Sequence, residues 1–106
     1  MSYYDAYNGD LKYALFNGST WSKQTVAAKG TVGLYSNLLF DDSGHADILY
    51  YSKNSDTVAR AQASGSSWNF TQVTTLGGRW ISRAVDGSGN ETISYLKGTA
   101  VVVLAI

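Results

Sequence analysis

The sequence contains no cysteine, no proline and only one histidine. Without cysteine the chain cannot form a disulfide, use a thiol nucleophile or bind a metal through thiolates. A single histidine excludes a metal centre built from several histidines of one chain. We therefore expect neither a metal site nor a cofactor.

Charge is also scarce and balanced. Charged residues make up 15% of the 106 residues, and eight Lys plus Arg face eight Asp plus Glu. This balance lacks the basic excess with which proteins bind nucleic acids or anionic membranes. No signal-like segment begins the sequence, and the apolar run Ala100–Ile106 is far shorter than the roughly 20 residues of a membrane-spanning helix. We expect a soluble chain without nucleic-acid or membrane partners, and its compartment stays open.

The residues that are abundant favour β-structure. Apolar residues reach 44%, aromatic residues reach 13% with eight tyrosines, and there are eleven glycines. Tyrosine and tryptophan are enriched in strands, and glycine supplies the turns between them. No segment shows the apolar spacing of a helix, so the sequence predicts an all-β fold.

An internal repeat is the strongest pattern in the sequence. Several residues recur 47 positions later, and after a deletion of two residues a further series recurs at a spacing of 45. Such collinear matches are typical of repeat architectures. The first series pairs Tyr3-Tyr4 with Tyr50-Tyr51, Ala14 with Ala61, Gly18-Ser19 with Gly65-Ser66, Trp21 with Trp68 and Val26 with Val73; the second includes Tyr35 with Trp80, Asp41 with Asp86, Ile48 with Ile93 and Tyr50 with Tyr95.

Each period contains four short strand-like runs. In the complete period these are Ser36–Asp41, Ala46–Ser52, Thr57–Ala63 and Trp68–Thr74. Connections of about four residues leave no room for a crossover helix, so successive strands are expected to pair antiparallel. Four meandering strands per period of this length are typical of a β-propeller blade.

The whole chain then corresponds to about two and a half blades. We expect a partial blade of three strands over residues 2–35, a full blade over 36–79 and another partial blade over 80–106, within one domain. Blades bury their faces against neighbouring blades, and closed propellers have about four to eight of them. The expected remedy is a homo-oligomer that completes the ring, with strand exchange at the incomplete blades. How the duplicated second and third strands are used at closure stays open.

These segments resemble a known family. The run Tyr3–Ala14, the segment Asn17–Trp21 and the segment Phe40–Gly44 are similar to the β-propeller repeat of large prokaryotic secreted and surface proteins. The resemblance covers nearly the whole chain and is closest in the first period. It implies a propeller fold, binding or display rather than one defined activity, and a fragment or an engineered propeller whose parent is secreted or surface-bound.

A weaker resemblance leads to fucose-binding propeller lectins of two repeats. Their sugar sites place an Arg before the tyrosine pair and a Glu on the next strand. Here Ser2 and Leu49 precede the tyrosine pairs, and the next strands carry Lys12-Tyr13 and Ala59-Arg60. The site residues of those lectins are therefore not assigned to this chain.

Three residues are candidates for binding a ligand. Trp80 and Tyr35 occupy corresponding positions at the start of two inner strands, where a groove between blades is expected, and Arg83 follows on the same strand as Trp80. Aromatic rings stack on sugars, and an arginine binds carboxylates. Tyr4, Tyr51, Trp21 and Trp68 recur in register, which favours a packing role for them.

Other chemistry finds little support. Asp41, Asp42, His45 and Asp47 are a possible calcium-binding group, but a hairpin turn explains the segment better. His45 could act as a general base, but no serine lies in a nucleophile motif such as Gly-x-Ser-x-Gly. For glycoside hydrolysis, the sequence indicates no pair of facing carboxylates and contains no sialidase Asp-box.

We therefore expect a non-enzymatic, self-assembling propeller module that serves as a binding or display scaffold. A carbohydrate-binding lectin with aromatic sites between blades is the alternative. A sialidase-like glycoside hydrolase is the third hypothesis.

Overall fold

A computed structural model describes all residues from Met1 to Ile106 and confirms the all-β prediction, because the chain forms ten strands and no helix. None of its elements is therefore a helix that could cross a membrane. The strands are β1 (Ser2–Asp5), β2 (Asp10–Phe16), β3 (Trp21–Ala27), β4 (Val32–Phe40), β5 (Ala46–Ser52), β6 (Thr57–Ser64), β7 (Ser67–Gln72), β8 (Arg79–Val85), β9 (Glu91–Lys97) and β10 (Ala100–Ala105).

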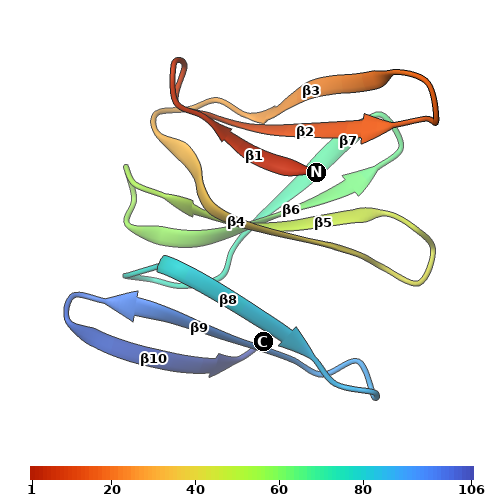
Figure 1. Ribbon diagram of the computed structural model, residues 1–106. Coiled ribbons are helices and arrows are strands. Elements are labelled where there is room, and N and C mark those ends of the chain that lie inside the picture. Colours follow the sequence, from red (N-terminus) through yellow and green to blue (C-terminus); the bar gives the residue numbers. More distant parts are fainter.

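The strands form three antiparallel meanders. The first sheet contains β1-β2-β3, the central sheet β4-β5-β6-β7 and the third sheet β8-β9-β10, each in chain order. Short connections explain this order, since neighbouring strands joined by a few residues pair antiparallel. Figure 1 shows the three sheets stacked, with the yellow-to-green central sheet between the other two.

The first sheet and strands β5–β7 share one pairing register. Tyr3 lies opposite Lys12, and Tyr50 lies opposite Ala59. The pair Phe16 and Trp21 likewise corresponds to the pair Ala63 and Trp68. All four positions shift by 47 residues, so the two segments present their side chains in the same pattern.

The central sheet is buried on both faces, and its strand β5 shows this most clearly. Every residue of β5 is buried except its last. Ala46, Ile48 and Tyr50 belong to a core against the first sheet, whereas Leu49 and Tyr51 belong to a core against the third sheet. The two sets alternate because successive side chains of a strand point to opposite faces.

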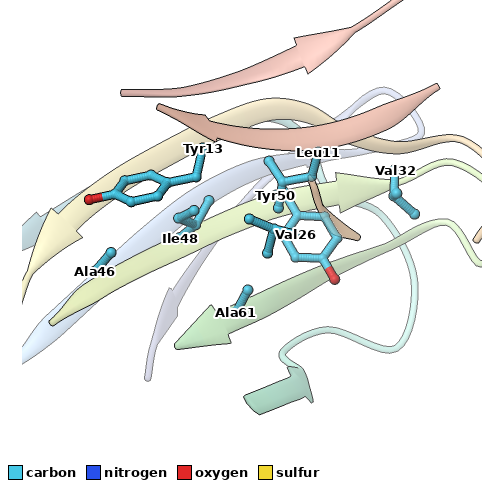
Figure 2. Close-up of a cluster of buried hydrophobic side chains, with 8 residues drawn as sticks. All are labelled: Leu11, Tyr13, Val26, Val32, Ala46, Ile48, Tyr50 and Ala61. Atoms are coloured by element: carbon cyan, nitrogen blue, oxygen red, sulfur yellow. The ribbon is translucent and has the colours of Figure 1, made fainter. Parts of the chain in front are cut away.

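Two hydrophobic cores therefore hold the three sheets together. In the first core, Leu11, Tyr13 and Val26 of the first sheet contact the central sheet (Figure 2). In the second core, Ile81, Ile93 and Tyr95 of the third sheet contact its opposite face. Each core resembles the packed interior between two aligned sheets.

Glycine permits the closest approach between the first and central sheets. Gly33 at the start of β4 has a φ of 105°, and a Cβ atom there would lie 2.7 Å from the Cα atom of Leu11. Both the backbone conformation and the contact require a residue without a side chain. Any larger residue would push β4 away from β2.

The inner strands begin earlier than the sequence predicts. β4 begins at Val32 rather than Ser36, and β8 begins at Arg79 rather than Trp80. The central sheet thus starts within the segment assigned to the first partial blade, at residues 2–35. Tyr35 lies between residues of β4 that pair with β5, and Trp80 lies between residues of β8 that pair with β9. An alternation pattern does not reveal such an interruption within a strand.

Candidate functional site

The boundary between the central and third sheets gathers unusual backbone conformations. Only three residues other than glycine have positive φ: Tyr35 at 53°, Asp56 at 54° and Trp80 at 58°. This left-handed conformation costs an L-residue about 1–2 kcal/mol. Such strained positions concentrate where a side chain has a function to perform.

Irregular pairing in two strands creates the positions of Tyr35 and Trp80. The register of β4 against β5 shifts between Leu34 and Asn37, and that of β8 against β9 shifts between Arg79 and Ser82. A bulge of this kind redirects side chains away from the regular alternation of a strand. Both aromatic residues lie inside such a shift.

The side chain of Asn37 ties the two irregular segments together. Its Nδ2 donates to the carbonyl oxygen of Ile81 at 2.9 Å and to the carbonyl oxygen of Tyr35 at 3.2 Å. One amide thus bridges β4 and β8 beside both bulges. Sequence reasoning missed Asn37, since an isolated asparagine in a strand carries no recognisable signal.

Tyr35 and Trp80, which the sequence predicts as ligand-binding residues, lie in direct contact. Their ring centroids are 4.7 Å apart with an interplanar angle of 42°, and Tyr35 also lies 6.1 Å from the ring of Tyr51. Trp80 is 66% exposed, whereas Tyr51 is buried. We call the pair Tyr35 and Trp80 the aromatic platform: an open indole supported from within by tyrosine.

A polar groove of about 430 Å³ adjoins the platform through Tyr51. The Tyr51 hydroxyl donates to Oδ1 of Asp56 at 2.5 Å. Burial, together with this carboxylate, raises the pKa of Tyr51 above its ordinary value, so the phenol stays protonated at neutral pH. The groove is lined by Tyr51, Lys53, Asp56, Arg79, Leu96 and Gly98.

Arg83, the third predicted ligand-binding residue, lies elsewhere. Its side chain is only 4% exposed, and its Nε donates to Oε2 of Glu91 at 2.5 Å. Its Nη1 donates to the carbonyl oxygen of Asp47 at 3.1 Å. The guanidinium is fully engaged within the protein, so the structure does not bring Arg83 to the aromatic platform.

Arg83 belongs to an ion network of four residues, which includes Asp47, Arg60 and Glu91. Arg60 binds both carboxylate oxygens of Asp47 through Nε and Nη2, at 3.0 Å each, and its Nη2 reaches Oε1 of Glu91 at 2.6 Å. The hydrogen bonds to Asp47 raise the pKa of Arg60. Two positive charges thus balance two negative ones.

This network links two sheets. Asp47 and Arg60 come from β5 and β6, and Arg83 and Glu91 come from β8 and β9. Guanidinium groups bind both carboxylates, so these four side chains join the two sheets. Sequence reasoning missed the network, although Asp47 and Glu91 both stand out as charged residues within apolar strands.

The acidic loop at Asp41 forms a hairpin turn, as the sequence favours. Oδ1 of Asp41 accepts hydrogen bonds from the backbone N–H groups of Ser43 and His45, at 2.9 and 2.8 Å. These bonds, led by the one from His45, lower the pKa of Asp41. Asp86 makes the same two bonds to Ser88 and Asn90. No group of three His, Cys, Asp or Glu side chains is placed to hold a metal ion.

Two of the recurring aromatic residues differ in their surroundings. Trp68 packs edge-on against Tyr13, with ring centroids 5.6 Å apart, and its Nε1 donates to Oε1 of Gln24 at 3.0 Å. Trp21, its counterpart 47 residues earlier, is 53% exposed on the outer surface of the first sheet. The same residue type is thus covered in one sheet and uncovered in another.

The aromatic platform and its groove bring aromatic and polar side chains together at one boundary between sheets. An exposed indole ring there lies next to a groove with several hydrogen-bonding side chains. Comparison with known proteins finds no family model, no curated protein and no solved structure that matches this chain.

Proposed function

We propose that the chain is a non-enzymatic β-propeller module, that its three sheets act as blades, and that copies of it assemble into a closed ring. The observation that carries this proposal is a pair of apolar surfaces, one on each outer sheet, whose counterparts inside the chain are buried. Closed propellers have about four to eight blades, so three sheets need those of further copies.

The outer surface of the first sheet repeats a surface that is covered elsewhere. In the central sheet, Ile48, Tyr50, Ala61 and Trp68 pack against the first sheet. Their counterparts 47 residues earlier surround a hollow of about 620 Å³ that faces solvent. We call this the first outer face; it contains Met1, Tyr3, Ala14, Trp21 and Lys23.

The outer surface of the third sheet offers the matching partner. Leu11 and Tyr13 of β2 cover the central sheet, and the strand registers place Val101 and Val103 of β10 at the corresponding positions. These valines, which we call the second outer face, are 74% and 69% exposed. The two outer faces differ from one another, so their contact is head-to-tail and closes by cyclic symmetry.

Measuring the mass of the chain in solution tests this proposal. Light scattering is expected to give a discrete multimer of the 11.4 kDa chain. Val103→Asp is expected to yield folded monomers, because a charge would be buried in the contact. Leu76→Asp serves as a control, since Leu76 is an exposed apolar residue outside both faces. A monodisperse monomer of the unmodified chain at high concentration would refute assembly.

A second candidate function, carbohydrate binding, is supported by the aromatic platform. A sugar ring stacks its C–H face on an open indole, and Trp80 offers such a ring with a second aromatic residue behind it. Trp80→Ala is expected to abolish sugar binding measured by calorimetry. Phe70→Ala provides the control, because Phe70 is also an exposed aromatic residue, at 53% against 66% for Trp80, but lies on β7. Equal binding by both variants would exclude the platform as the sugar site.

A further inference from the structure

We infer that the aromatic platform selects a sugar that carries a carboxylate, such as a hexuronic acid. This inference rests on the carbohydrate-binding function proposed above and names the class of sugar. It follows from the charges around the polar groove.

The groove carries an excess of positive charge, with Lys53 and Arg79 against the single carboxylate of Asp56. Lys53 and Arg79 line it, and neither side chain makes an ion pair within the chain. The single carboxylate of the groove, Asp56, accepts the hydroxyl of Tyr51. Arg79 also lies beside the Tyr51 hydroxyl. The two cations and one carboxylate leave the groove with one positive charge in excess. An anion is the group that would complete this arrangement.

The positions of the residues bring ring and cation together. Arg79 directly precedes Trp80 on β8, within the segment where the pairing register shifts. Tyr51 lines the groove and its ring also contacts Tyr35, the inner half of the platform. A pyranose stacked on Trp80 thus has the groove beside it. A carboxylate on the sugar ring would reach into it toward Arg79.

Arginine is suited to this task by its shape as well as its charge. The planar guanidinium donates two parallel hydrogen bonds to a carboxylate, which combines attraction with orientation. The hydroxymethyl group of a neutral hexose offers no negative charge to the same guanidinium. The site should therefore distinguish two sugars that differ only at this carbon.

The test compares methyl β-glucuronide with methyl β-glucoside, which share a ring and differ only in the carboxylate. Calorimetry on the full chain is expected to show roughly tenfold tighter binding of the glucuronide, which corresponds to about 1.4 kcal/mol. Arg79→Gln is expected to reduce glucuronide affinity to that of the glucoside and to leave the glucoside unaffected. Lys29→Gln, which removes an exposed cation outside the groove, is expected to change neither.

The outcomes separate this inference from the function on which it depends. Equal affinities for the two glycosides, lost together in Trp80→Ala, would overturn the preference for acidic sugars and retain sugar binding. Absence of binding by either glycoside would overturn both. A preference that survives Arg79→Gln would also refute the inference, because the structure assigns the carboxylate to that guanidinium.

Discussion

Truncating the two corresponding tryptophans provides a sharp test of assembly, because Trp68 is covered within the chain whereas only a second copy in the proposed ring would cover Trp21. Trp68→Ala removes an edge-on contact with Tyr13 and a hydrogen bond to Gln24. The aromatic contact is worth about 1 kcal/mol, and the hydrogen bond contributes about another. With the buried part of the indole, the expected loss is about 3 kcal/mol, at the lower end for tryptophan truncation.

Trp21→Ala is expected to behave differently. In a single chain Trp21 is half exposed and its ring lies against that of Phe16, with centroids 5.1 Å apart, so its loss costs about 1 kcal/mol. In a closed ring the neighbouring copy covers Trp21 as the first sheet covers Trp68. The cost then rises toward about 3 kcal/mol.

Urea unfolding followed by circular dichroism at two protein concentrations measures this difference. Stability that depends on association increases with concentration, by about 1 kcal/mol for each tenfold step. The loss of unfolding free energy caused by Trp21→Ala should therefore increase with protein concentration. The loss caused by Trp68→Ala should be at least about 3 kcal/mol at every concentration. A cost for Trp21→Ala that stays near 1 kcal/mol at every concentration would refute the reasoning.

Three further predictions follow from the structure. Gly33→Ala should destabilise the fold by about 3 kcal/mol or more, whereas Gly44→Ala should cost only about 1 kcal/mol. Both glycines have positive φ, but only Gly33 lies against another strand. The urea midpoints of the two variants measure the difference in stability. Glu91→Gln should cost about 3 kcal/mol in calorimetric stability, because two guanidinium groups lose a charged partner; a loss under about 1 kcal/mol would contradict this. Burial raises the pKa of Tyr50, so the folded state holds the phenolic proton to a higher pH than the unfolded chain does. The free energy of unfolding should therefore be constant below about pH 10 and decrease above it. A urea midpoint that does not change toward about pH 11 would contradict this.

The backbone of the aromatic platform is strained at both of its residues. Tyr35 and Trp80 adopt a conformation that glycine or asparagine would adopt more easily. The contacts between them, and the bridge from Asn37 to Ile81, offset part of that cost. Replacing the two residues with glycine or asparagine would relieve this backbone strain. Strained residues concentrate at functional sites, which is why the binding proposal centres on these two rings.

The sequence by itself determined the all-β class and most strand positions. Alternation and glycine-rich turns placed β5 correctly at Ala46–Ser52 and limited each connection to a few residues. Antiparallel meanders follow from such short connections, because a parallel pair would need a longer crossover. The spacing of Tyr35 and Trp80 also identified two aromatic residues that the structure brings together.

Tertiary structure alone decided which side chains meet across sheets. Arg83 was predicted with Tyr35 and Trp80 as a ligand-binding residue, and the structure places its side chain against Glu91, on a strand whose register shifts between Arg79 and Ser82. Asn37 and Arg79 also border register shifts, in β4 and β8 respectively, and these shifts decide what their side chains contact. Local sequence fixes pairing between neighbouring strands, whereas the contacts between sheets depend on twist, bulges and register that no short segment encodes.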